Sequence, residues 1–254
     1  MIKIFKNDKI LSESLALEII LELKKKKKLV LGCPSGRSLK KTYYYLGRIS
    51  YNLNISLDKL KIVMMDEFVK KNKGKYELVD PKSHFSCVRF SKIVLKKLLN
   101  YKKNKKNSLK EKNILFPTLK DPKNYNKLIK KLGGIDIFLL ASGATDGHVA
   151  FNNVKSKTQQ KTHIILLSKQ TRKDNMKSFT NFNYLSEVPT YGLTVGLNTI
   201  TSLSKKAILV LTGKDKKYSW EKLKKLKKFN KNWPSSIVYK CKNYKIYLDS
   251  KVNS

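Results

Sequence analysis

The chain has 254 residues, a formal net charge of +38 and three cysteines. This length suits one large domain with a substantial core, so residues 1–254 are predicted to form a single domain. The sequence contains neither a signal-peptide pattern nor an apolar run of about 18 residues, which argues against a membrane protein and favours a cytoplasmic one.

The positive charge comes almost entirely from lysine, since only four arginines occur. A protein that recognises specific bases would use more arginine, whose guanidinium forms bidentate hydrogen bonds, so no specific nucleic-acid partner is predicted. The lysine excess is interpreted as a compositional bias that also attracts small anions. Cys33, Cys87 and Cys241 lack metal-type spacing, so neither a structural zinc site nor a disulfide framework is predicted.

Strands and helices are expected to alternate along the chain. Residues 12–23 have helical spacing with Ser12 as start signal, residues 29–33 form a short apolar run, and residues 38–49 again have helical spacing. Further strands are predicted at residues 60–66, 135–141, 162–167 and 206–212, and further helices at 83–99, 125–134 and 216–226. The lysine- and asparagine-rich residues 70–76 and 102–113 are predicted to be solvated loops.

This alternation predicts βαβ units and therefore an α/β fold with a doubly wound, mostly parallel, Rossmann-like sheet flanked by helices. Ligands of such sheets bind at the carboxyl ends of the strands. Three loops at predicted strand ends therefore carry the candidate chemistry.

The first loop, Leu-Gly-Cys-Pro-Ser-Gly-Arg-Ser at residues 31–38, joins a strand to a helix. Its small residues, hydroxyls and free helix-start N–H groups suit a phosphate, although a plain tight turn is an equal alternative. The spacing matches neither the P-loop nor the dinucleotide motif, so no nucleotide cofactor is predicted.

The second loop places Asp66 and Glu67 at the end of the strand predicted at residues 60–66. A carboxylate at this position could act as a general base, and the alternative is a carboxylate that caps a helix or pairs with a cation.

The third loop, residues 141–153, holds Asp146 and His148 two positions apart. A carboxylate beside an imidazole fixes its tautomer and raises its basicity. His84 and His163 are predicted to be structural.

Five segments together resemble the glucosamine-6-phosphate deaminase and 6-phosphogluconolactonase superfamily. They are residues 31–38, the Met-Met-Asp-Glu-Phe-Val segment at 64–69, Asp-Gly-His-Val-Ala-Phe-Asn at 146–152, and residues 188–200 and 208–216. The third is similar to the deaminase signature Asp-Gly-His-Ile-Ala-Phe-Asn, whereas lactonases usually continue differently after Asp-Gly-His.

The resemblance implies a metal-free and cofactor-free deaminase/isomerase-type enzyme that acts on a phosphorylated amino sugar. It assigns Asp66 to proton transfer between C2 and C1 of the opened sugar, and His148, oriented by Asp146, to ring opening. The residues that it places around the substrate and its phosphate are Ser35, Gly36, Arg37, Ser38, Glu67, Gly147, Asn153, Lys177 and Lys216, with Arg172 as a competitor of Lys177 for the phosphate.

Two positions depart from the deaminase pattern. Asn153 stands where deaminases generally have glutamate, and an amide cannot stabilise an imidazolium by charge. Lys177 replaces an arginine and loses its bidentate fork. Lactone hydrolysis, isomerisation of another sugar phosphate, and a catalytically weak protein that binds sugar phosphate or nucleic acid are therefore the alternatives. Because the family includes monomers and hexamers, a homo-oligomer is left open.

Overall fold

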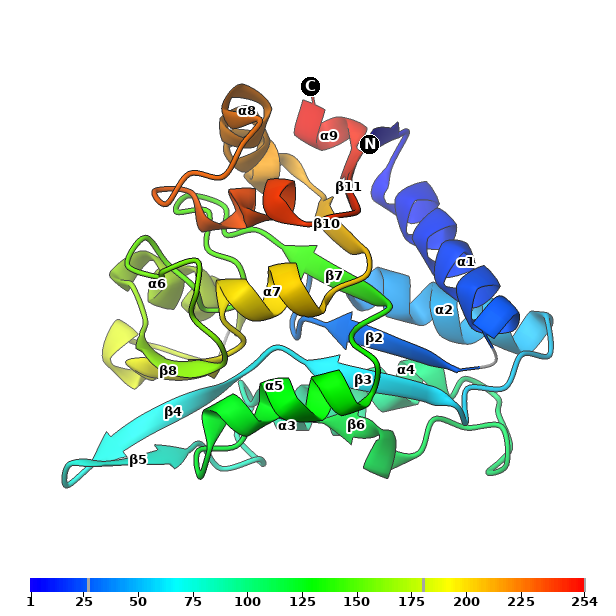
Figure 1. The fold of residues 1–254 in the computed structure, drawn as a ribbon, viewed down its shortest axis with the longest axis horizontal. Helices are drawn as coiled ribbons and strands as arrows, with labels where there is room; N and C mark the ends of the chain where they lie inside the picture. Colours follow the sequence, from blue (N-terminus) through cyan, green and yellow to red (C-terminus); the bar gives the residue numbers. More distant parts are fainter. Residues whose placement is uncertain (27, 180, 254) are drawn as a thin grey trace.

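The computed structural model describes residues 1–26, 28–179 and 181–253, and two β-sheets organise it (Figure 1). Within these residues every strand pair of the larger sheet is parallel. Its strand order is β1 (Ile2–Phe5), β11 (Tyr244–Asp249), β10 (Ala207–Leu211), β7 (Ile137–Ala141), β2 (Leu29–Cys33), β3 (Leu60–Met64) and β6 (Ile114–Leu115). The predicted α/β fold with a doubly wound, parallel sheet is confirmed.

Helices cover both faces of this sheet. The helices α1 (Asp8–Lys26) and α2 (Lys40–Asn52) pack on one face. The helices α5 (Pro122–Lys131), α7 (Leu197–Leu203) and α8 (Lys217–Leu226) pack on the other. In Figure 1, α5 and α7 lie in front of the parallel strands and α2 lies behind them. Because side chains alternate along a strand, Leu29 and Leu31 of β2 join the first core and Val30 joins the second.

The second sheet is antiparallel and was not predicted. Its order is β5 (Lys75–Leu78), β4 (Asp66–Asn72), β9 (Tyr191–Thr194) and β8 (His163–Leu166). The strand predicted at residues 162–167 therefore exists, but it lies outside the parallel sheet. The loop predicted at residues 70–76 is wrong, because these residues form most of the exposed β4–β5 hairpin. Phe68, Phe85, Phe151 and Phe182 make a third core beneath this sheet.

Two predicted helix starts are also corrected. The helix α1 begins at Asp8, since the side chain of Asn7 accepts a hydrogen bond from the backbone N–H of Ile10 at 2.9 Å. Ser12 is buried inside the helix instead of capping it. The helix predicted at residues 83–99 begins after Ser86, whose hydroxyl accepts from the N–H of Arg89. It consists of α3 (Cys87–Arg89), the π-helical η1 (Phe90–Leu95) and α4 (Lys96–Leu99).

Six further helical segments complete the described residues, and α6 among them contributes to the site described below. They are η2 (Glu111–Asn113), α6 (Lys169–Ser178), η3 (Leu185–Glu187), η4 (Lys214–Lys216), η5 (Pro234–Lys240) and α9 (Ser250–Asn253). Among the residues that the structure describes, no helix is both long and apolar enough to span a bilayer. That residues 1–254 form one domain stays a prediction.

Candidate active site

A cavity of about 730 Å³ opens where the carboxyl ends of β2, β3, β7 and β10 meet, and α6 contributes to its wall. Asp66 and His148, which come from separate strand ends, both line it. The predicted site residues in its lining are Ser35, Gly36, Arg37, Ser38, Asp66, His148, Lys177 and Lys216. This is the edge of the sheet at which a doubly wound fold binds its ligands.

Three cations face this cavity from three elements. Arg37 follows β2, Lys177 lies on α6 and Lys216 ends η4. The ammonium of Lys216 donates to the carbonyl of Ser142 at 2.9 Å. Burial lowers the pKa of Lys216, and the charge of Arg37 acts in the same direction, against nearby carboxylates. A bound anion would offset this repulsion, so these cations form a suitable site for a phosphate.

The loop after β2 has the shape of an anion cradle. Gly36 adopts a φ of +85°, which favours glycine, and a Cβ there would meet open space. Ser35 and Ser38 stand on either side of Gly36 and Arg37 and line the same cavity. The geometry therefore favours the anion site over the plain turn.

Asp66 is a buried carboxyl with 6% of its surface exposed. Burial raises its pKa to about 7, and the neighbouring Glu67 charge adds to this, while the Cys87 thiol and the His148 charge oppose it. The Cys87 thiol donates to Oδ1 of Asp66 at 3.4 Å. A carboxyl with a pKa near neutrality can both accept and return a proton, as a general base and acid must.

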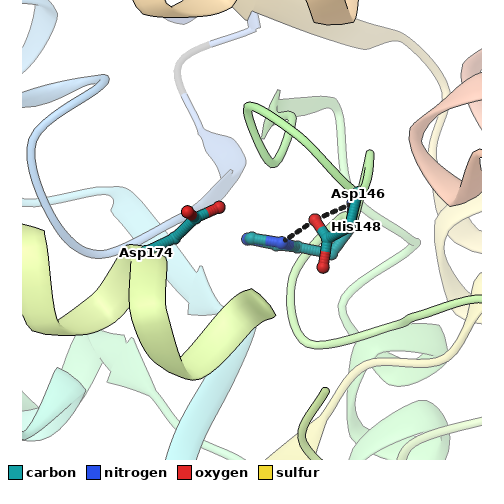
Figure 2. A group of neighbouring side chains, drawn as sticks. All are labelled: Asp146, His148 and Asp174. Carbon is teal, nitrogen blue, oxygen red and sulfur yellow. Dashed lines mark hydrogen bonds and ion pairs between the residues drawn. The ribbon is translucent and has the colours of Figure 1, made fainter. Parts of the chain in front are cut away.

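His148 lines the cavity together with Asp66, and Asp146 pairs with it. Nδ1 of His148 lies 2.7 Å from Oδ1 of Asp146 (Figure 2). Because a carboxylate only accepts, Nδ1 carries the proton and the second ring nitrogen is left for a ligand. Gly143 makes room for the pair, since a Cβ there would lie 2.3 Å from Nδ1.

Asp146 itself does not line the cavity but supports His148 from behind. Its Oδ2 accepts hydrogen bonds from the hydroxyls of Ser168 at 3.0 Å and Thr171 at 3.1 Å. Burial raises the pKa of Asp146, but the hydrogen bond and charge of His148 outweigh burial, and the pKa lies well below its ordinary value. Asp146 thus stays ionised and fixes the ring.

A third acidic side chain, Asp174 on α6, joins this pair. One potential ligand atom from each of Asp146, His148 and Asp174 lies within 4.8 Å of the other two. This is the group of possible metal ligands found in the described part of the chain, but Nδ1 of His148 and Asp146 already satisfy each other. Its donors thus suit a hydrogen-bonded acid–base pair better than a preformed cation site.

Glu67 and Arg172 were predicted beside the substrate, but both lie outside the cavity lining. The carboxylate of Glu67 accepts from the N–H groups of Phe68, Cys87 and Val88 and from the Ser86 hydroxyl. It therefore anchors the start of α3 as the capping alternative foresaw.

The guanidinium of Arg172 donates to the carbonyls of Leu185 and Val188 and so holds η3. Of the two predicted competitors for an anion, Lys177 faces the cavity and Arg172 does not.

Gly147 and Asn153 also lie away from the cavity lining. Gly147 has a φ of +63°, and a Cβ there would lie 2.4 Å from the Trp233 ring, so it permits close packing. The amide of Asn153 donates to the carbonyl of Leu166 and accepts from the N–H of Lys155. Asn153 therefore fixes its own loop.

Sequence reasoning missed four residues that the structure brings to the site: Gly143, Ser168, Thr171 and Asp174. Each lies far along the chain from its partner or carries no chemistry alone. The Ser168-x-x-Thr171 spacing signals a helix start, since the Ser168 hydroxyl accepts from the N–H of Thr171. That signal does not reveal the contact of either hydroxyl with Asp146.

Known proteins of similar sequence and structure agree with the motifs. The glucosamine-6-phosphate deaminase of Malacoplasma penetrans (strain HF-2) is 31% identical over 238 residues, which cover 93% of either protein. Glucosamine-6-phosphate deaminase 1 of Bacillus subtilis (strain 168) is 28% identical over 237 residues, 91% of this chain and 89% of that one. No family model matches the chain.

Among solved structures, a monomeric glucosamine-6-phosphate deaminase has a TM-score of 0.81 at 25% identity, covering 99% of this chain and 98% of that one. A 6-phosphogluconolactonase from Thermotoga maritima has a TM-score of 0.64 at 14% identity, covering 98% and 97%, which is a likeness of fold alone. The resemblance inferred from the five sequence segments is confirmed. The chain belongs to the glucosamine-6-phosphate deaminase family.

Proposed function

We propose that this protein converts glucosamine 6-phosphate and water into fructose 6-phosphate and ammonia. The observation that carries the proposal is that Asp66 and His148 line one cavity together with three cations. The cations would hold the dianionic phosphate and thereby place the carbon skeleton between an acid and a base. In this reaction the protein is an isomerising hydrolase.

Ring opening would use His148. Its ring is fixed at Nδ1 by Asp146, so in the protonated ring the other nitrogen can give its proton to the ring oxygen of the sugar while a water molecule takes the proton of the C1 hydroxyl. The products are the open-chain aldehyde and the C5 hydroxyl.

Proton transfer would then use Asp66. Its carboxylate takes the proton from C2, which gives an enolamine, and the carboxylic acid returns that proton to C1. A pKa of about 7 suits both directions at neutral pH. The resulting imine at C2 is hydrolysed by water, which supplies the ketone oxygen as ammonia leaves.

The decisive experiment incubates the protein with glucosamine 6-phosphate and measures ammonia and fructose 6-phosphate in equal amounts. We expect Asp66→Asn and His148→Gln each to lower kcat by at least about 100-fold. Asp80→Asn, at an exposed carboxylate, and His163→Gln, outside the cavity lining, are the matched controls and should retain activity.

Unchanged turnover in both Asp66→Asn and His148→Gln would remove the basis of the proposal. Hydrolysis of a sugar-phosphate lactone without ammonia from any amino sugar would instead favour the lactonase alternative. A panel of sugar phosphates in the same assay identifies the substrate epimer.

The partner that we propose is a small phosphorylated sugar, with no specific nucleic acid and no membrane. A cytoplasmic location is part of the proposal, since Cys33, Cys87 and Cys241 are all free and buried, as suits a reducing compartment. Self-association stays a prediction that light scattering would test.

A further inference from the structure

The two carboxylate oxygens of Asp174 differ in their hydrogen bonds. One oxygen, Oδ1, accepts from the side-chain amide of Gln170 at 3.0 Å. The other, Oδ2, is buried and has no hydrogen-bond partner among the described residues. Buried polar atoms are rarely left unsatisfied, so a donor that approaches from the cavity is the expected complement.

The ring of His148, when protonated, carries an N–H and a positive charge close to Asp174. A carboxylate oxygen of Asp174 lies within 4.8 Å of a ring nitrogen of His148. Figure 2 shows Asp174 facing the end of the ring that points away from Asp146. The imidazole therefore lies between two carboxylates, one from the loop after β7 and one from α6.

We propose that Asp174 is a positioning residue for His148, which stabilises the protonated ring and directs its free N–H toward the substrate. The role in catalysis rests on the proposed function, whereas the effect on the ring does not. An opposite charge at this separation favours the charged form of an imidazole.

Other charges also face this ring. Asp66 at the start of β4 and Asp146 in the loop after β7 add negative charge. Lys216 and Arg37 carry positive charge in the same cavity, and Lys216 interacts electrostatically with both Asp146 and Asp174. Without Asp174, the positive charges of Lys216 and Arg37 would destabilise the imidazolium more strongly.

Asn153 cannot supply this second carboxylate. Its amide is buried and held by Leu166 and Lys155, outside the cavity lining. Asp174 is thus the side chain of α6 that can place a negative charge near the protonated ring from the cavity side.

The test compares Asp174→Asn and Asp174→Glu with the unmodified protein. Proton NMR follows the titration of the His148 ring in the substrate-free protein, and the signal that disappears in His148→Gln assigns it. We expect Asp174→Asn to lower the midpoint of this titration by about one pH unit, a tenfold loss of proton affinity. Asp174→Glu should restore most of the shift.

The matched control is Asp215→Asn, which removes an equal charge from the same cavity at a side chain that is 62% exposed. Its shift should stay below about 0.3 units because solvent screens an exposed charge. An unchanged midpoint in Asp174→Asn, with its thermal unfolding temperature also unchanged, would overturn the proposal whether or not the protein releases ammonia.

The catalytic readout is the pH dependence of kcat. If His148 acts as an acid, Asp174→Asn should lower kcat about tenfold above neutrality and little below it, with KM within about threefold. An equal loss of kcat at every pH would mean a structural role and would contradict the proposal. Absence of ammonia with a shifted ring titration would contradict the proposed function alone.

Discussion

Because Asp66 is buried, its ionised form lowers the stability of the folded protein. Its pKa in the folded protein is about 7, against an ordinary value of 3.8, so the folded form holds its proton more tightly than the unfolded form. The stability that protonation contributes is complete below the ordinary value and is lost as the pH rises through about 7.

We therefore expect Asp66→Asn to stabilise the protein at alkaline pH while abolishing turnover. Relative to the unmodified protein, the rise in the free energy of unfolding should be about 1–3 kcal/mol larger near pH 8 than near pH 5. Urea unfolding at both pH values measures this. An equal effect at the two pH values would show that the carboxylate is not the buried group that the structure describes.

Two further substitutions separate the roles of Lys177 and Arg172, both on α6. Lys177→Ala should raise KM for a phosphorylated sugar by about 10–100-fold, because a charge-assisted contact to phosphate is lost. Its stability should change by less than about 0.5 kcal/mol, since Lys177 is exposed.

Arg172→Ala should do the reverse. It removes the donors of the Val188 carbonyl and one of the two donors of the Leu185 carbonyl, and it should cost about 2 kcal/mol of stability, with KM within about threefold. Steady-state kinetics and urea unfolding of both variants check this. A larger rise in KM for Arg172→Ala than for Lys177→Ala would reverse the assignment.

At the residue scale, the sequence predicted the chemistry that is local in the chain. Asp146 and His148 are two positions apart, so a single loop shows the pair. Asp174 remained hidden because it meets His148 only when α6 packs beside the loop after β7. The family resemblance placed both Asp66 and Glu67 at the substrate, although adjacent strand residues point to opposite sides.

At the element scale, Glu67 joins the small sheet to the helical segment that begins with α3. Its two oxygens accept four hydrogen bonds, three of them from the backbone N–H groups of Phe68, Cys87 and Val88. This junction also positions Cys87 against Asp66.

We expect Glu67→Gln to destabilise the protein by about 2–4 kcal/mol, because an amide NH₂ would face backbone donors. Glu77→Gln, at an exposed position of β5, is the matched control and should change stability by less than about 0.5 kcal/mol. Chemical unfolding of both variants provides the comparison, and equal stability of the two would refute the anchoring role.

The small sheet shows where prediction of elements from sequence fails. Lys70, Lys71 and Asn72 have low strand propensity and were interpreted as loop. Their strand conformation depends on pairing with β5 across a tight turn, and the buried half of β4 pairs with β9 more than 100 residues away. Short apolar runs buried on both faces, such as β2 and β10, were predictable because burial itself shapes their composition.

At the scale of the whole molecule, topology brings the predicted loops together. The order of β10, β7, β2 and β3 within one parallel sheet places four strand ends side by side. Alternation of strands and helices was enough to predict that edge as the site. The strand order itself depends on contacts between distant segments, so local sequence patterns do not predict it.

The net charge of +38 predicts opposite effects of salt on substrate affinity and on stability. Raising NaCl from about 0.05 M to about 0.5 M should raise KM for the phosphorylated sugar about 3–10-fold and also raise the unfolding temperature, because salt screens both attraction of the dianion and self-repulsion. Kinetics and thermal unfolding across the series measure both.

Lys24→Gln with Lys25→Gln, at the far end of α1 from the cavity, should leave KM within about twofold, whereas Lys177→Ala should flatten its salt dependence. A KM independent of salt would mean that the cations of the cavity do not hold the phosphate.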